Sequence, residues 1–137
     1  MGMLDSKVVL VTGGGRGIGR DFSLAMARAG AKVVVNDLGS STDGQDVEGR
    51  PAQEVVKEIS DLGGEAVANF GSVSNYDDAK QMVKDAIDNF GQLDCVVNNA
   101  GILRDRMFHK MSIEEWHSVI DVHLHGTFYI SRAAAEH

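Results

Sequence analysis

Short apolar runs alternate along the chain with longer segments in which apolar residues recur every three or four positions. The runs predict β-strands, and the first two are apolar almost throughout, which is typical of strands buried on both faces of a sheet. The segments with helical spacing predict α-helices between the strands. The expected strands cover residues 7–11, 32–37, 65–70 and 93–97, and the expected helices begin at Gly17, Pro51, Ser74 and Ser112.

Residues typical of helix ends mark the borders of these helices. Pro51 occupies a first-turn position, and Ser112 with Glu115 has the pattern of a capping box. Ser74 with Asp77 resembles another N-cap. A left-handed residue commonly closes a helix, and glycines follow the first three helices at Gly30, Gly63–Gly64 and Gly91.

Four alternations of strand and helix are typical of right-handed βαβ units around a parallel sheet. We therefore expect an α/β fold, the N-terminal part of a Rossmann-type doubly wound parallel sheet of four strands with flanking helices. In such sheets ligands bind beyond the carboxyl ends of the strands, so the residues directly after each strand are the candidates for a site. The polar stretch 38–50, after the second strand, has the length of a functional or mobile loop.

The composition excludes several classes of protein. The 137 residues suffice for one domain at most, and 13 basic against 20 acidic side chains give a formal net charge of −7. This acidic balance argues against nucleic acid or a membrane surface as a partner, and no apolar run reaches the roughly 18 residues of a membrane span. The single cysteine, Cys95, excludes an internal disulfide and fits a reducing compartment. Its place inside a strand predicts a core residue.

The first strand is followed by a glycine-rich turn, Thr12-Gly-Gly-Gly-Arg-Gly-Ile-Gly19. Its spacing departs from the general dinucleotide pattern G-x-G-x-x-G but fits T-G-x-x-x-G-x-G. Gly13 permits a tight turn, and Gly17 leaves room for a pyrophosphate at the helix N-terminus, where free N–H groups attract anions. Gly19 lets the helix pack close to the sheet. A plain glycine-rich turn is the alternative, but the position between strand and helix favours a dinucleotide site.

Two further strand ends carry suitable polar residues. Asp37 follows the second strand, 20 residues beyond Gly17, where an acid accepts hydrogen bonds from the adenosine ribose. Its charge would repel a 2′-phosphate, so we expect NAD rather than NADP, with neighbouring Arg16 softening this preference. Alternatively, Asp37 only initiates the loop that follows. Asn98-Asn-Ala-Gly101 follows the fourth strand, and its small and amide residues suit a ribose and nicotinamide passing over the backbone.

Together these motifs resemble the short-chain dehydrogenase/reductase family over essentially the whole chain. Asn36-Asp-Leu-Gly39, the long loop after it and Gly101-Ile-Leu-Arg-Asp-Arg106 are similar to the (3R)-hydroxyacyl-CoA dehydrogenase branch, which includes the first domain of peroxisomal multifunctional enzymes. The 3-oxoacyl-acyl-carrier-protein reductases, which usually prefer NADP, are the nearest alternative. The resemblance implies hydride transfer between a nicotinamide cofactor and an acyl-CoA-type substrate, or another small secondary alcohol or ketone.

The resemblance also implies the residues of the site. His123 stands where many members have the Asn of a proton relay, and we expect it to substitute as a catalytic residue. In place of an Asp that holds the adenine amino group in many members, this sequence has Gly71. No metal site is expected, because His123 and His125 point to nearly opposite sides of a helix. The expected cofactor-binding residues are Gly13, Arg16, Gly17, Ile18, Gly19, Asp37, Leu38, Ser72, Val73, Asn99, Ala100 and Gly101.

In the family a Ser on a fifth strand and a Tyr-x-x-x-Lys pair perform the proton chemistry, and these positions fall beyond His137. Residues 1–137 are therefore expected to form a single dinucleotide-binding region, incomplete at its C-terminal end, that binds cofactor without catalysing. Tyr76 and Lys80 have the same spacing but open a helix before the fourth strand, where the family has no catalytic residue. We interpret them as surface residues.

Other functions stay open at this stage. A non-enzymatic nucleotide-binding module would share the cofactor motifs without the acid–base residues. An S-adenosylmethionine methyltransferase also has a glycine-rich first turn and an acid after the second strand, but Thr12 and Asn98–Gly101 disfavour it. Without a fifth strand, residues 93–97 would form an exposed apolar edge, so we expect a homo-oligomer. The expected location is the cytoplasm, or the peroxisome in a eukaryote.

Overall fold

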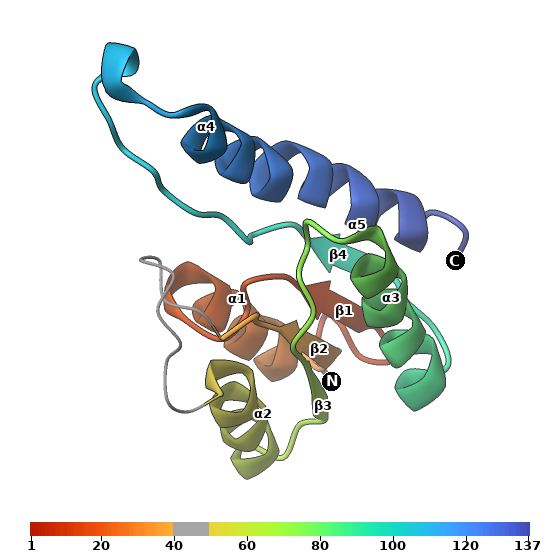
Figure 1. Ribbon diagram of the computed structural model, residues 1–137. Coiled ribbons are helices and arrows are strands. Elements are labelled where there is room, and N and C mark those ends of the chain that lie inside the picture. The colour runs from red at the N-terminus through yellow and green to blue at the C-terminus, as the bar shows by residue number, and fades with distance from the viewer. Residues whose placement is uncertain (40–49) are drawn as a thin grey trace.

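A parallel four-stranded sheet with helices on both faces forms the centre of the computed structural model, which describes residues 1–39 and 50–137 (Figure 1). The strand order is β3-β2-β1-β4, and every neighbouring pair is parallel. The predicted Rossmann-type α/β fold is therefore confirmed. Most of the polar stretch predicted to be a loop lies outside the described residues. The strands are β1 (Val8–Val11), β2 (Lys32–Asn36), β3 (Ala66–Asn69) and β4 (Cys95–Val97).

The central strand β1 contributes alternate side chains to two apolar layers. Val8 and Leu10 belong to the layer beneath α3 (Tyr76–Phe90) and α5 (Gly126–Ala134). Val9 and Val11 belong to the opposite layer, beneath α1 (Gly17–Arg28) and α2 (Pro51–Asp61). Because successive side chains of a strand point to opposite faces, a continuous apolar run is what this double burial requires.

The chain reverses its direction of winding at β1. It proceeds from β1 through β2 to β3, and then crosses back to place β4 on the other side of β1. The carboxyl ends of β1 and β4 therefore flank the point where the strand order reverses, which is where open α/β sheets bind their ligands.

The helix ends follow the predicted signals with one correction. The capping box of α4 (Ile113–Ile120) is present, with both hydrogen bonds between Ser112 and Glu115 at 3.0 Å. The N-cap of α3, however, is Asn75, whose side chain accepts from the Asp78 N–H at 3.0 Å. Ser74 was the wrong choice because its hydroxyl bonds the Ser72 hydroxyl at 2.8 Å instead.

The last predicted helix is divided into three parts. A π-helical turn, η2 (Asp121–His125), separates α4 from α5, and a short 3₁₀ turn, η1 (Phe108–Lys110), precedes α4. Gly126 begins α5 against Val73, where a Cβ would lie 2.8 Å from a methyl carbon of that side chain. The spacing of apolar residues does not reveal such a turn, because one extra residue shifts the pattern only slightly.

Cys95 is exposed, which corrects its prediction as a core residue. It is the first residue of β4, and β4 forms one edge of the described sheet. The other two residues of this strand, Val96 and Val97, are only partly buried. Of the described helices, none is both long and apolar enough to cross a membrane.

Asp94 joins the start of β1 to the start of β4. Its carboxylate accepts from the Val8 N–H at 2.8 Å and from Gln92 at 2.6 Å, and it lies 3.4 Å from the Lys7 ammonium. The hydrogen bond from Val8, followed by that from Gln92, lowers the pKa of Asp94 below its ordinary value. A carboxyl whose pKa is lowered by folding stabilises the fold above its unfolded pKa, and this contribution is lost as the pH falls through the folded pKa.

We therefore expect Asp94→Asn to be less stable than the unmodified chain above about pH 4, the ordinary carboxyl pKa. The two unfolding free energies should converge as the pH falls further, because Asp94 then becomes protonated in the unmodified chain. Urea unfolding between neutral and acid pH measures the difference. Asp61→Asn, which alters an exposed carboxylate 3.0 Å from Lys57 on the same helix, is the control. A constant gap between the two curves at every pH would contradict the role of Asp94.

Candidate functional site

A cavity of about 410 Å³ lies beyond the carboxyl ends of the strands, on the side predicted from the topology. Its wall combines residues at or after the ends of all four strands, the first residue of α1 and one residue of η2. The lining residues are Gly13, Arg16, Gly17, Asn36, Asp37, Leu38, Gly71, Ser72, Val73, Asn99, Ala100, Gly101, Ile102 and Val122. Two of the expected cofactor-binding residues, Ile18 and Gly19, are not in the wall: Ile18 is 69% exposed and Gly19 is buried.

The glycine-rich turn shapes the part of the wall at the start of α1. Gly17 has a φ of +54°, and a Cβ built there would meet no atom within 4 Å, so its side faces open space. The first N–H groups of α1 have no partner within the helix, which makes this end suitable for an anion. Gly19 acts differently, because its Cβ would lie 1.9 Å from the Gly13 carbonyl oxygen and 2.4 Å from the Asn99 amide nitrogen. It allows the close approach of helix and sheet.

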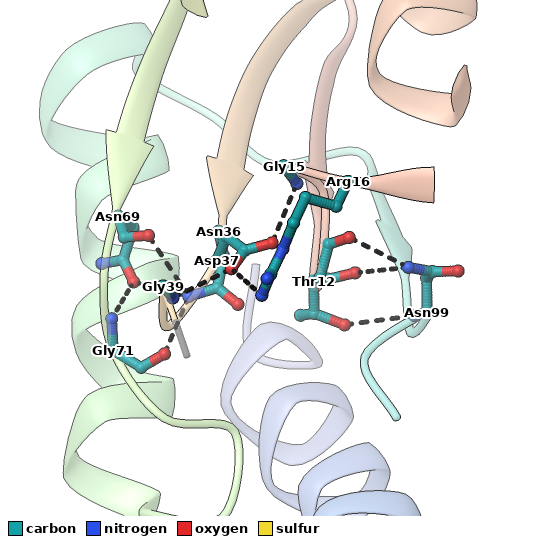
Figure 2. A network of polar contacts seen from close by, with 10 residues as sticks. Thr12, Gly15, Arg16, Asn36, Asp37, Gly39, Asn69, Gly71 and Asn99 are labelled. Atoms are coloured by element: carbon teal, nitrogen blue, oxygen red, sulfur yellow. Dashed lines mark hydrogen bonds and ion pairs between the residues drawn. The ribbon is translucent and has the colours of Figure 1, made fainter. Parts of the chain in front are cut away.

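Asp37 places a carboxylate in the wall while itself being only 5% exposed. One oxygen accepts from the Gly15 N–H at 3.2 Å, and the other accepts from the Gly39 N–H at 2.9 Å and lies 3.3 Å from an Arg16 guanidinium nitrogen (Figure 2). The bond to Gly39, two residues on, is the contact that a loop-initiating Asp would make. The structure therefore shows that one carboxylate does both: it begins the loop and lines the cavity.

Thr12 and Asn99 connect the loops after β1 and β4 (Figure 2). Thr12 is only 1% exposed. Its hydroxyl accepts from the N–H groups of Asn99 and Ala100, both at 3.1 Å. In return the Asn99 amide donates to the carbonyl oxygens of Thr12 and Gly13, both at 3.1 Å. The Asn99 amide nitrogen is therefore engaged within the protein, and the backbone of this segment lies along the cavity.

A second polar network supports the wall beside β2 and β3. The Asn36 amide donates to the Asn69 side-chain oxygen at 2.9 Å and to the Gly71 carbonyl at 3.0 Å. That Asn69 oxygen also accepts from the Gly71 N–H at 2.8 Å, while the Asn69 amide donates to Asp85 at 2.7 Å. Four wall residues were missed from the sequence, namely Asn36, Gly71, Ile102 and Val122. The signal that could have found Asn36 is a buried strand that ends in Asn. A partly buried strand also ends in Asn at Asn69, two residues before Gly71.

His123 contacts the loop after β4 from the other side. Its Nε2 atom lies 3.1 Å from the Ile102 nitrogen and 2.9 Å from the Ile102 oxygen, and its ring would be 2.7 Å from a Cβ on Gly101. The ring is not part of the cavity wall, although the preceding residue, Val122, is. Its expected role as a catalytic residue stays a prediction.

Tyr76 and Lys80 lie on α3, outside the cavity wall. The Lys80 ammonium is 2.8 Å from Asp77 and 5.3 Å from the centre of the Tyr76 ring. The hydrogen bond and charge of Asp77 raise the pKa of Lys80 above its ordinary value, the reverse of what a proton-transfer lysine needs. Both residues are surface groups, as interpreted from their position in the sequence.

Comparison with known proteins identifies the family. A model of the short chain dehydrogenase family matches residues 7–137. The chain is 51% identical over 134 residues to a short-chain type dehydrogenase/reductase of Mycobacterium tuberculosis, covering 98% of this chain and 47% of that protein. It is 47% identical over 132 residues to a hydroxyacyl-CoA dehydrogenase of the same organism, covering 96% and 40%, respectively. It is 43% identical over 136 residues to a 3-oxoacyl-[acyl-carrier-protein] reductase of Synechocystis, covering 99% and 52%.

A solved structure agrees with these relatives. The crystal structure of a short chain dehydrogenase from Mycobacterium avium superposes with a TM-score of 0.91 and 51% sequence identity, covering 98% of this chain and 47% of that one. The chain thus spans between 40% and 52% of the length of these relatives. It belongs to the short chain dehydrogenase family, and the methyltransferase alternative is excluded.

The Thr12 hydroxyl can be tested without any ligand. Thr12→Val keeps the shape of the side chain but leaves the N–H groups of Asn99 and Ala100 without their acceptor, in a partly buried setting. We expect the free energy of unfolding to fall by about 1–3 kcal/mol, the cost of leaving such groups unpaired. Thr12→Ser retains the hydroxyl and should lose much less. Equal urea-unfolding curves for the two variants would show that the hydrogen bonds do not hold the loops together.

Proposed function

We propose that this member of the short chain dehydrogenase family binds NAD in the cavity and provides the cofactor site for interconversion of 3-hydroxyacyl and 3-oxoacyl thioesters. The observation that carries the proposal is the shared wall of Gly17 and Asp37. An open helix N-terminus and a nearly buried carboxylate, both facing one cavity, offer separate sites for a pyrophosphate and for a ribose diol.

The position of Asp37 favours NAD over NADP. Its oxygens are held in place by the N–H groups of Gly15 and Gly39, so the carboxylate cannot easily turn away from a ligand. A 2′-phosphate beside this group would experience like-charge repulsion in a place shielded from water. Arg16 lies 3.3 Å from the same carboxylate and offsets part of that repulsion. We therefore propose a preference for NAD rather than an absolute exclusion of NADP.

The segment from Asn99 to Ile102 supports the nicotinamide end of this arrangement. It lines the cavity at the end of β4, across the sheet from Asp37, and the hydrogen bonds to Thr12 fix its backbone. Bound NAD would supply a carbon that accepts or donates hydride. The role of this chain would be to orient the cofactor, to keep its charged half against α1 and to present one face of the nicotinamide.

The proposed substrate class depends on the relatives. The hydroxyacyl-CoA dehydrogenase at 47% identity supports a coenzyme A thioester. The reductase at 43% identity supports the second candidate, a thioester carried by acyl-carrier protein. Turnover of the CoA-linked against the protein-linked 3-oxoacyl thioester, by a protein that contains this chain, distinguishes the two.

A third candidate is a nucleotide-binding module without catalytic activity. The Tyr-x-x-x-Lys spacing occurs in the sequence at Tyr76 and Lys80, which lie away from the cavity. We accordingly propose that residues 1–137 bind the cofactor without catalysing. For this reason binding, rather than turnover, is the informative property of the chain.

Calorimetric titration with NAD and NADP tests the cofactor site. We expect NAD to bind more tightly than NADP, and Asp37→Asn to weaken NAD binding by about 10-fold or more, since hydrogen bonds to charged groups contribute about 1.5–3 kcal/mol. The variant should also discriminate less between the two cofactors, because the repelling charge is gone. Asp61→Asn, remote from the cavity, controls for the loss of one negative charge.

Two results would count against the proposal. Absence of heat with millimolar NAD would remove the cofactor site altogether. Unchanged NAD affinity and unchanged discrimination in Asp37→Asn, with a folded variant by circular dichroism, would remove the role of Asp37.

A further inference from the structure

Asn36 is nearly buried and yet belongs to the cavity wall. It is the last residue of β2, directly before Asp37, and only 2% of it is exposed. Its amide nitrogen donates to the Asn69 side-chain oxygen at 2.9 Å and to the Gly71 carbonyl oxygen at 3.0 Å (Figure 2). Because a side-chain amide has two N–H donors, both are used within the protein.

The backbone of Gly71 fixes which way the two amides face. A backbone N–H can only donate and a backbone carbonyl can only accept. The Asn69 oxygen therefore faces the Gly71 N–H, at 2.8 Å, and the Asn36 nitrogen faces the Gly71 carbonyl. On the far side, the Asp85 carboxylate accepts from the Asn69 nitrogen at 2.7 Å. Turning either amide over would bring two donors or two acceptors together, so the direction of the Asn36 oxygen is determined.

The Asn36 side-chain oxygen has no donor. Within residues 1–39 and 50–137, the hydrogen bonds of this side chain all start from its nitrogen. In the same part of the chain, every fully buried side-chain nitrogen or oxygen has a partner. The Asn36 oxygen is therefore not sealed in the interior, and the space that its residue borders is the cavity. An acceptor held in place at a cavity wall is suited to a donor group of a ligand.

The wall beside Asn36 suits a flat base. Gly71 has no side chain, and Val73 is apolar and 8% exposed. The Ser72 hydroxyl is bonded to a neighbouring hydroxyl at 2.8 Å. On the other side, Asp37 offers a charged acceptor, which the proposed function assigns to the ribose diol. The Asn36 oxygen is left as a neutral acceptor between the ribose position and the small residues after β3.

We propose that the Asn36 side-chain oxygen accepts a hydrogen bond from the amino group of the adenine base, in the orientation that Gly71 and Asn69 fix. The assignment rests on the proposed function, because the ligand is the adenosine half of NAD. Asn36 is then a specificity-determining residue. A base with a carbonyl oxygen in place of the amino group would bring two acceptors face to face, and the protein would bind it less well.

The first experiment compares NAD with nicotinamide hypoxanthine dinucleotide, which carries an oxygen in place of the adenine amino group. We expect calorimetry on the unmodified chain to show about tenfold weaker binding of the hypoxanthine dinucleotide, the effect of one lost hydrogen bond. Equal affinities would overturn the role of Asn36 and leave the proposed function standing. Binding of neither dinucleotide would remove the proposed function, and the assignment of Asn36 with it.

The second experiment separates a direct contact from a general disturbance of the wall. Asn36→Leu keeps a similar volume but removes the acceptor. We expect its affinity for NAD to fall about tenfold, while its affinity for the hypoxanthine dinucleotide stays unchanged. Asn89→Leu, which alters an exposed amide on α3, is the control and should keep the preference for NAD. An equal loss of affinity for both dinucleotides in Asn36→Leu would overturn the proposal.

A third measurement needs no substitution and decides the case if Asn36→Leu does not fold. The NMR signal of the Asn36 side-chain carbonyl carbon reports a hydrogen bond to its oxygen. We expect this signal to move further on saturation with NAD than on saturation with the hypoxanthine dinucleotide. Equal shifts with the two ligands would show that the amino group is not the donor, and would overturn the proposal.

Discussion

Thr12 and Asn99 exchange hydrogen bonds across the gap between the ends of β1 and β4, and this exchange ties together two of the loops that line the cavity. Two loops that leave adjacent parallel strands have no backbone ladder to hold them once the strands end. Here one hydroxyl accepts two N–H groups of the second loop, and one amide donates to two carbonyl oxygens of the first. Gly19 completes the arrangement, because any side chain there would occupy the space of the Gly13 carbonyl and the Asn99 amide.

The remaining wall follows the same physical rule, in which backbone groups at strand ends are paired by side chains from neighbouring loops. Asp37 pairs the N–H groups of Gly15 and Gly39, and Asn69 pairs the N–H of Gly71. These bonds stabilise irregular backbone that would otherwise leave polar groups unsatisfied. They also leave a cavity with a carboxylate at one position and an open helix N-terminus at another. A ligand that combines a diol with a diphosphate matches this distribution.

The sequence predicts the parts of this site that depend on strand order and on single glycines. A buried apolar run followed by glycines, an acid or asparagines identified Gly13, Gly17, Asp37 and the Asn99–Gly101 segment, because each of them lies shortly after the end of a strand. Ile102 and Val122 could not be predicted, since they reach the wall through the path of a loop and through a π-helical turn. The prediction of Cys95 as a core residue was wrong because it assumed a position inside the strand, whereas β4 begins at Cys95 and lies at one edge of the described sheet. The prediction of Ser74 as the N-cap of α3 was wrong because Ser74 and Asn75 are adjacent and both suit this position, so that only the geometry selects Asn75.

The most direct test of the account is to map NAD on the chain by NMR, following every backbone amide during a titration. We predict that the shifted amides cluster after all four strands together, in residues 13–17, 37–39, 71–73 and 99–102. Binding to one of these segments alone would not require the common wall that the cavity provides. Shifts confined to the outer faces of α2 and α3, or none at millimolar NAD, would contradict the proposal that these four strand ends form one dinucleotide site.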